Sequence, residues 1–133
     1  MKKKIQQSND LADEFLRKAF DAEEDGQLEE AICLLKKAAR LGSNAARSKL
    51  GTTYDDVVTP SQPDRAVYWY KQGVKNGYSD CAWNLAMHYA GLGRRRGYLY
   101  WLRIANEMGD EDAPEELRTG EWWSKRTKDI ARK

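Results

Sequence analysis

The chain has 133 residues, of which 41% are hydrophobic and 33% charged, and its formal net charge is +2. This length suits one domain, residues 1–133, with a continuous hydrophobic core. The small net charge argues against general polyanion binding, and no segment has the roughly 20 apolar residues of a membrane span. Lys2–Lys4 could begin a signal peptide, but polar residues follow it. We therefore expect a cytoplasmic protein that does not bind membranes.

The first two expected helices are bounded by polar caps and by glycine. Ser8–Asp10 offers N-cap side chains for a helix that ends near Glu24, ahead of the turn residues Asp25-Gly26. A second helix should run from about residue 27 to 41 and end at Gly42, because glycine readily takes the left-handed conformation of helix ends. The turn between them is short, as in a helix pair.

The third and fourth helices are separated by the longest interruption in the pattern, residues 57–62. Ser43 or Asn44 is the expected N-cap of the third helix. Further on, Ser61-x-x-Asp64 resembles a capping box, with a proline inside it at the first helical turn. The fourth helix is therefore predicted to start at this point.

The later helices follow similar signals. Ser79 is the expected cap of a fifth helix, which Gly91-Leu92-Gly93 closes. A sixth helix holds residues 98–108, and Asp112 opens a seventh. Between the fifth and sixth helices, Arg94–Arg96 is expected to form a basic turn.

A repeat of 32 to 35 residues runs through these helices. In residues 31–42, 66–77 and 98–109, a glycine lies eleven residues after the first position of the pattern. The other helices start on a small residue at 12, 46, 81 and 113, in steps of 34, 35 and 32 residues. Such a period predicts stacked helix pairs, a solenoid. The expected repeats are residues 10–42, 44–77 and 79–109, with a partial repeat at 112–120 and a capping helix at 121–133.

Most aromatic residues of the repeat are predicted to lie in the hydrophobic core. Side chains four residues apart share a helix face, so a small residue, Leu and an aromatic residue form one buried stripe. The aromatic residues assigned to the core are Tyr54, Trp69, Tyr89 and Trp101. Cys81 stands where neighbouring repeats have Ala and should be a small buried side chain, and its spacing to Cys33 predicts no disulfide.

Two motifs carry a resemblance to a known family. They are Ala46-x-x-x-Leu50-Gly51-x-x-Tyr54 with Ala66-x-x-Trp69-Tyr70, and Cys81-x-x-x-Leu85-Ala86-x-x-Tyr89 with Trp101. Together they resemble SEL-one-like repeats, a variant of the tetratricopeptide type, over residues 10–117. The resemblance implies an all-α, right-handed α-α superhelix of about three helix pairs with a partial fourth and a capping helix. It also implies adaptor or scaffold roles, and some bacterial members neutralise toxins.

The family places partner-binding residues on the concave face, which the first helix of each pair lines. We expect contacts there from Lys18, Ser48, Lys49, Thr52, Trp83, Asn84, Met87 and Trp122. The wider face would add Glu14, Phe15, Asp21, Asp55, Ala90, Glu116 and Thr119. On the second helices, Tyr68 and Tyr100 hold equivalent positions that should be half exposed on the convex side, where they either cover helix junctions or form a second contact surface.

No residue pattern predicts catalysis. His88 has no second histidine or cysteine at zinc-ligand spacing, and no nucleophile can be paired with it. The motif Gly91-Leu92-Gly93 follows a helix rather than a strand, so it is no phosphate loop. We therefore expect no enzyme, no cofactor and no metal. The expected function is a protein–protein interaction module, with a stand-alone inhibitor such as a toxin-neutralising (immunity) protein as the alternative. The oligomeric state stays open.

Nucleic-acid binding is a further alternative. Arg94–Arg96 and the basic, Trp-containing segment 121–133 interleave cations with aromatic residues, as single-strand binders do. Carboxylates on the expected groove, at Glu14, Asp21 and Glu116 for example, would repel phosphate. The basic segments and the acidic segment 110–121 are interpreted instead as solvated helix faces that match helix dipoles.

Overall fold

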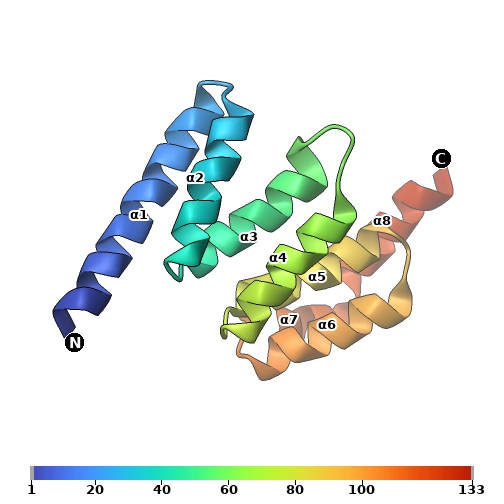
Figure 1. Cartoon of the computed structure of the whole chain (residues 1–133). Coiled ribbons are helices and arrows are strands. Elements are labelled where there is room, and N and C mark those ends of the chain that lie inside the picture. Colours follow the sequence, from blue (N-terminus) through green and yellow to red (C-terminus); the bar gives the residue numbers. More distant parts are fainter. Residues whose placement is uncertain (1, 133) are drawn as a thin grey trace. The chain divides into compact units, whose positions relative to one another are not determined.

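Figure 1 shows a computed structural model of the chain, whose backbone is described for residues 2–132 and whose side chains are described for residues 9–126. Over residues 2–132 every regular element is a helix, which confirms the all-α class. Neighbouring helices pack in pairs. The chain forms two compact units, Met1–Trp69 and Tyr70–Lys133, and the boundary falls within one helix.

Unit 1 consists of a long helix pair followed by a third helix (Figure 1). Its elements are α1 (Lys2–Glu24), α2 (Leu28–Arg40), α3 (Asn44–Thr52), the π-helix η1 (Thr53–Val57) and the first part of α4 (Pro63–Lys75). Helix α2 contacts both α1 and α3. The third helix was expected to carry Tyr54, but this residue lies in η1, where the helix widens before the interruption.

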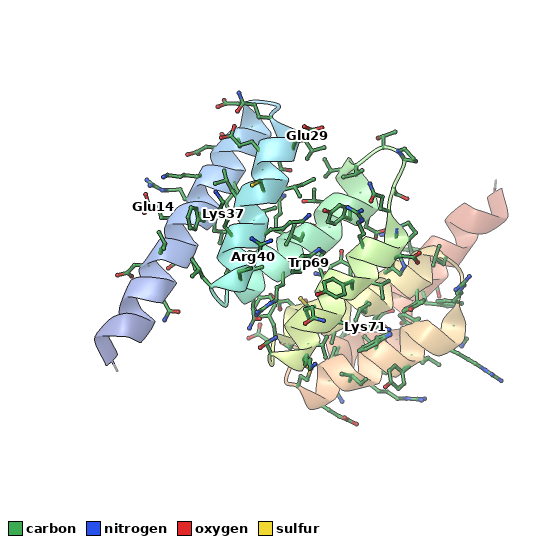
Figure 2. The ribbon with its side chains drawn as sticks, viewed as in Figure 1. Glu14, Glu29, Lys37, Arg40, Trp69 and Lys71 are labelled. Carbon is green, nitrogen blue, oxygen red and sulfur yellow. The ribbon has the colours of Figure 1, made fainter. Side chains whose placement is uncertain are left out.

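Alanines form much of the contact between α1 and α2. The buried residues of this pair are Ala12, Ala19, Ala22, Ala31, Leu35, Ala38 and Ala39. Such small side chains allow two helix backbones to approach closely. Lys37 extends from α2 (Figure 2), and its ammonium lies 5.7 Å from the centre of the Phe15 ring on α1, a cation–π contact between the two helices.

Unit 2 contains a second helix pair and two shorter C-terminal helices. Its elements are the end of α4, α5 (Ser79–Gly91), α6 (Arg95–Glu107), α7 (Ala113–Thr119) and α8 (Glu121–Arg132). Helices α5 and α6 form the pair, α6 contacts α7, and α5 contacts α8. The core of this unit is a cluster of Ala82, Ala86, Ala90, Tyr98, Leu102, Ala105 and Ala113, with Trp83, Met87 and Trp123 packed against it.

The repeated glycines have one structural role. Gly42, Gly77 and Gly109 all have positive φ, at 100°, 84° and 92°. The next residue donates its N–H to the carbonyl five positions back, with N–O distances of 3.0 Å to Ala38, 2.9 Å to Gly73 and 2.9 Å to Ala105. This is the Schellman closure, in which a left-handed residue lets the chain satisfy its last carbonyls. The eleven-residue spacing therefore marks three equivalent helix ends.

Several expected helix starts are wrong by a few residues. Helix α1 begins at Lys2, so Ser8–Asp10 lies inside it, because the preceding residues include neither glycine nor proline and can continue the helix. Helix α4 begins at Pro63, which puts Gln62 rather than Ser61 before it. The N-cap of α5 is Tyr78, and Ser79 is the first residue of the helix. This is because Tyr78 also completes the Schellman closure at the end of α4, so α5 begins directly after it. The expected cap of α3 is confirmed: Ser43 Oγ accepts the Ala46 N–H at 3.1 Å.

The expected basic turn is also mostly helical. Arg94 is the N-cap of α6, and Arg95 and Arg96 lie in its first turn. Positive charge is unfavourable there, because the N-terminus of a helix already carries a partial positive charge. Dipole matching therefore does not account for these arginines, in contrast to the sequence-based interpretation.

The expected core aromatics are buried to different degrees. Tyr54 is buried, whereas Trp69, Tyr89 and Trp101 are only partly buried. Cys81 is fully buried, as predicted. A β-carbon on Gly97 would lie 2.7 Å from Cγ of Tyr89. Helices α5 and α6 therefore approach closely at a residue with no side chain.

Candidate functional site: an aromatic and acidic hollow in unit 2

The predicted site residues of unit 1 are engaged with their own unit. Lys18 forms an exposed ion pair with Glu14 one helical turn earlier, at 3.2 Å. Lys49 Nζ lies 3.0 Å from Glu23 on α1. The Thr52 hydroxyl donates to the carbonyl of Lys49 at 3.0 Å. These contacts give the residues local structural roles, and a role in partner binding stays a prediction for them and for Ser48.

In unit 2, two of the predicted contact residues, together with Glu116 and Thr119 of the wider expected face, meet at one hollow. Trp83 on α5 and Trp122 on α8 line a cavity of about 320 Å³, which we call the Trp83–Trp122 hollow. The other lining residues are Asp112, Glu115, Glu116, Thr119 and Glu121. Trp122 is 47% exposed, whereas Trp83 is partly buried against the core of the unit. The predicted residues Asn84 and Met87 do not line this hollow.

Two tight chain reversals bring the walls of the hollow together. Asp112 is the N-cap of α7, as predicted, and the carboxylate that satisfies the helix start is that of Asp110, whose Oδ2 accepts the N–H groups of Asp112 and Ala113 at 3.0 and 2.9 Å. Helix α7 then ends at Gly120, whose φ is 61°, and α8 begins at the next residue. A helix of seven residues between two such reversals places Asp112, Glu115 and Glu116 at the same cavity as Trp122.

The burial of Glu116 contradicts the expectation that this side chain is exposed on the concave groove. It is only 4% exposed, and its carboxylate accepts the hydroxyl hydrogen of Tyr98. The same carboxylate accepts the N–H of Trp122 at 3.0 Å and that of Trp123 at 3.3 Å. These are the second and third residues of α8, so Glu116 serves as an N-cap supplied from the preceding helix. Ala90, also expected on the groove, is fully buried in the core cluster.

The buried Tyr98 holds this junction together. Its ring stacks on Trp123 at a centroid distance of 5.2 Å, and its hydroxyl donates to Glu116. Burial, followed by the hydrogen bond to Glu116, raises the pKa of Tyr98 well above its usual value. The phenol therefore stays protonated as a donor at neutral pH. Helical spacing in the sequence places Trp123, Thr127 and Ile130 on one face of the C-terminal helix, and the side chains of the last two lie outside the described residues.

The hollow is electronegative. Four of its lining residues are acidic, and none of the described lining residues is basic. Arg118 lies 2.5 Å from Glu115 and lowers the pKa of that carboxyl, and Lys125 lies 3.4 Å from Glu121. All four of these side chains are largely exposed, so the pairs contribute little and can exchange with other cations.

Asp112, Glu115 and Glu121 were not predicted as site residues. The sequence signal was present as an acidic segment, 110–121, directly followed by two tryptophans. From sequence this segment is interpreted as a solvated helix face that matches helix dipoles, and nothing in its spacing to Trp83 indicates a shared cavity. Only packing of α7 and α8 against the α5–α6 pair brings these residues together.

The two candidate contact tyrosines are half exposed, as predicted. Tyr68 is 54% exposed and Tyr100 is 58% exposed. Each ring meets the following tryptophan edge to face, Tyr68 with Trp69 at 5.1 Å and Tyr100 with Trp101 at 5.0 Å. This contact is sufficient to explain the two residues structurally, and a convex contact surface stays a prediction.

Basic side chains lie over the tryptophans of α8. The guanidinium of Arg95 is 5.3 Å from the centre of the Trp123 ring, and that of Arg126 is 5.9 Å from the Trp122 ring.

Within the described part of the chain, no group of three or more His, Cys, Asp and Glu residues is arranged to hold a metal ion. Nor does any described helix combine the length and apolarity needed to cross a bilayer.

Comparison with known proteins gives one partial likeness. An F-box protein of Arabidopsis thaliana is 38% identical over 64 residues, which are 48% of this chain and 18% of that protein. No family model matches the chain. No solved structure matches it.

Proposed function

We propose that the protein is a non-catalytic interaction module that binds another protein, and that it does so at the Trp83–Trp122 hollow. The proposed scaffold is a right-handed solenoid of SEL-one-like repeats. Its proposed setting is the cytoplasm, where an exposed thiol such as that of Cys33, which is in no disulfide, stays reduced.

The exposure of Trp122 carries this proposal. A tryptophan that is 47% exposed beside a cavity offers a large rigid surface that a partner can bury. Tryptophan is among the residues that contribute most to protein–protein binding, because it combines a large apolar area with few rotatable bonds. The second ring at the same cavity, Trp83, would give the bound group a wall on another helix.

The repeat scaffold is supported by the equivalent helix ends at Gly42, Gly77 and Gly109. The 64-residue likeness to the F-box protein is also close to two steps of the 34- and 35-residue repeat. Helix pairs that recur in otherwise different proteins are typical of repeat modules, whose units contact mainly their neighbours. The family itself remains part of the proposal.

The first experiment identifies and then measures a partner. The immobilised protein is used to capture binding proteins from its native host, and the captured protein is purified and titrated against the wild type. We expect Trp122→Ala to raise the Kd at least about tenfold, since hot-spot tryptophans contribute 2 kcal/mol or more. The matched control is Leu11→Ala in unit 1, another half-exposed apolar residue, at 42%.

Two results would contradict the proposal. One is an unchanged Kd for Trp122→Ala in a variant whose unfolding midpoint is retained. The other is the absence of any saturable protein partner. Trp83→Ala is less suitable as the first variant, because Trp83 packs against the core cluster and its loss also affects stability.

A narrower version is a stand-alone inhibitor, such as a toxin-neutralising protein. It is suggested by the resemblance to SEL-one-like repeats, some bacterial members of which neutralise toxins. If the captured partner is a toxic enzyme, stoichiometric addition of the protein should abolish its activity, and Trp122→Ala should require a higher concentration. An active enzyme in the saturated complex would favour an adaptor.

Nucleic-acid binding is the second candidate, supported by Arg94–Arg96. These exposed arginines lie at a helix N-terminus, where positive charge is unfavourable for stability, so a binding role would explain them. Binding to phosphates should weaken steeply as salt is raised from 50 to 200 mM. No salt-dependent binding to single- or double-stranded oligonucleotides, or no loss of it in Arg95→Ala/Arg96→Ala, would exclude this role.

A further inference from the structure

We propose that the Trp83–Trp122 hollow binds the side chain of an arginine or lysine on the partner protein. This inference rests on the proposed function, because it names the chemistry of the group that the partner inserts. It follows from the combination of two indole rings, a cavity and a one-sided set of charges.

The charges of the hollow select a cation. Asp112, Glu115, Glu116 and Glu121 line it, and the described lining residues include no cation. Glu116 is already engaged by three donors, so the carboxylates left for a partner are those at the rim. Within the described residues, those of Glu115 and Glu121 pair with exposed Arg118 and Lys125, and an incoming cation can replace such weak pairs. A phosphate or an acidic peptide would be repelled.

The aromatic walls suit the same ligand. The face of an indole ring attracts cations more strongly than other aromatic side chains do. Trp122 already accepts one guanidinium in this way, that of Arg126 at 5.9 Å, and Arg126 does not line the hollow. A planar guanidinium can stack on a ring while its edge donates to carboxylates, which favours arginine over lysine.

The hollow is preorganised for such a ligand. Glu116 accepts the N–H groups of Trp122 and Trp123, and Tyr98 fixes Glu116 from α6. The start of α8 is therefore held before a partner arrives, which reduces the entropy lost on binding. The cavity, at about 320 Å³, is at the small end of ligand pockets and is suited to a single side chain.

The test uses peptides of defined charge. The ¹⁵N-labelled protein is titrated with an acetylated, amidated Gly/Ser nonapeptide that has one central arginine, and with its citrulline counterpart, which has the same shape and no charge. We expect saturable shifts of the indole N–H signals of Trp83 and Trp122 and none of Trp69 in unit 1. The citrulline peptide should bind at least about tenfold more weakly, as expected for loss of a charge-assisted contact.

Charge variants of the protein complete the test. Asp112→Asn/Glu121→Gln should weaken binding of the arginine peptide about five- to tenfold, whereas Glu29→Gln, an exposed acid of unit 1, should leave it unchanged. Equal binding of the citrulline peptide, or unchanged binding by the double variant, overturns the inference. Spermidine is the comparison for a free polyamine, and preferential binding of spermidine also overturns the assignment to a protein side chain.

The two proposals fail separately. If the captured partner loses affinity for Trp122→Ala but not for Asp112→Asn/Glu121→Gln, the interaction function stands and the cationic ligand is wrong. If neither variant affects the partner, both the proposed site and its ligand are wrong.

Discussion

Units 1 and 2 use the same helix-pair closure but differ in what their predicted site residues do. In unit 1, Lys49 and Thr52 are held by short contacts inside the unit. In unit 2, Trp83 and Trp122 line a cavity surrounded by carboxylates. Repeat positions with the same place in the scaffold therefore need not have the same function. The candidate site lies where the second unit departs from the pattern of the first.

One departure explains much of this difference. The position held by Ala31 and Ala66 in the earlier repeats is Tyr98 in unit 2, and all three residues are buried. Alanine at this position only permits close packing, whereas Tyr98 extends to Glu116 and stacks on Trp123. The larger side chain thus joins the pair α5–α6 to the C-terminal helices that complete the hollow.

The largest expected effect is that of Glu116→Ala. This change leaves the Tyr98 hydroxyl and two N–H groups of α8 without their acceptor, and we expect the free energy of unfolding to fall by about 3 kcal/mol. Chemical denaturation measures it, with the exposed Glu29→Ala of unit 1 as the control. If Glu116→Ala lowered the free energy of unfolding by less than Glu29→Ala does, Glu116 would not stabilise the contact between Tyr98 and the start of α8.

Gly97→Ala tests the close approach that is specific to unit 2. The new β-carbon would meet Cγ of Tyr89 at 2.7 Å, and we expect a loss of about 2 kcal/mol from overpacking. Unit 1 has Glu30 and Arg65 at the equivalent positions, and both are exposed. Glu30→Ala should therefore change the unfolding free energy little, and equal effects at the two positions would remove this distinction between the units.

Gly42→Ala and Gly109→Ala test what the units share. Both glycines have positive φ with open space around them, so the cost is backbone strain of about 1 kcal/mol at each site. Thermal or chemical unfolding of the two variants should give similar losses. A large loss at only one glycine would show that the two helix ends are not equivalent.

Alkaline pH should affect unit 2 through Tyr98. Its folded-state pKa is raised above the unfolded value of 10.0, so its contribution to stability is complete below pH 10 and is lost as pH rises further. Unfolding measured between pH 8 and 11 should show a steeper decline for the wild type than for Tyr98→Phe. Tyr78, whose pKa is also raised, provides the comparison variant Tyr78→Phe. Parallel curves for wild type and Tyr98→Phe would contradict the assignment.

The helical class, the glycine-terminated helix ends and much of the alanine-rich packing could be predicted from the residue pattern. These features are local or periodic: a glycine eleven residues after an apolar position predicts a closure, because left-handed backbone strongly favours glycine. Helix starts were less certain, as at Ser8–Asp10 and Ser79, because several adjacent polar residues can serve as caps and the neighbouring chain decides among them.

The hollow and the role of Glu116 depend instead on contacts between residues that are far apart in the sequence. From sequence, Glu116 is one acidic residue among many on a short helix, and its burial depends on Tyr98, 18 residues earlier, and on the N–H groups of α8. The family resemblance already placed Trp83 and Trp122 on one expected concave face, but it gave no indication that Asp112, Glu115 and Glu121 line a hollow with them. Contacts of this kind arise from how α5, α7 and α8 pack, and no periodicity in the chain encodes them.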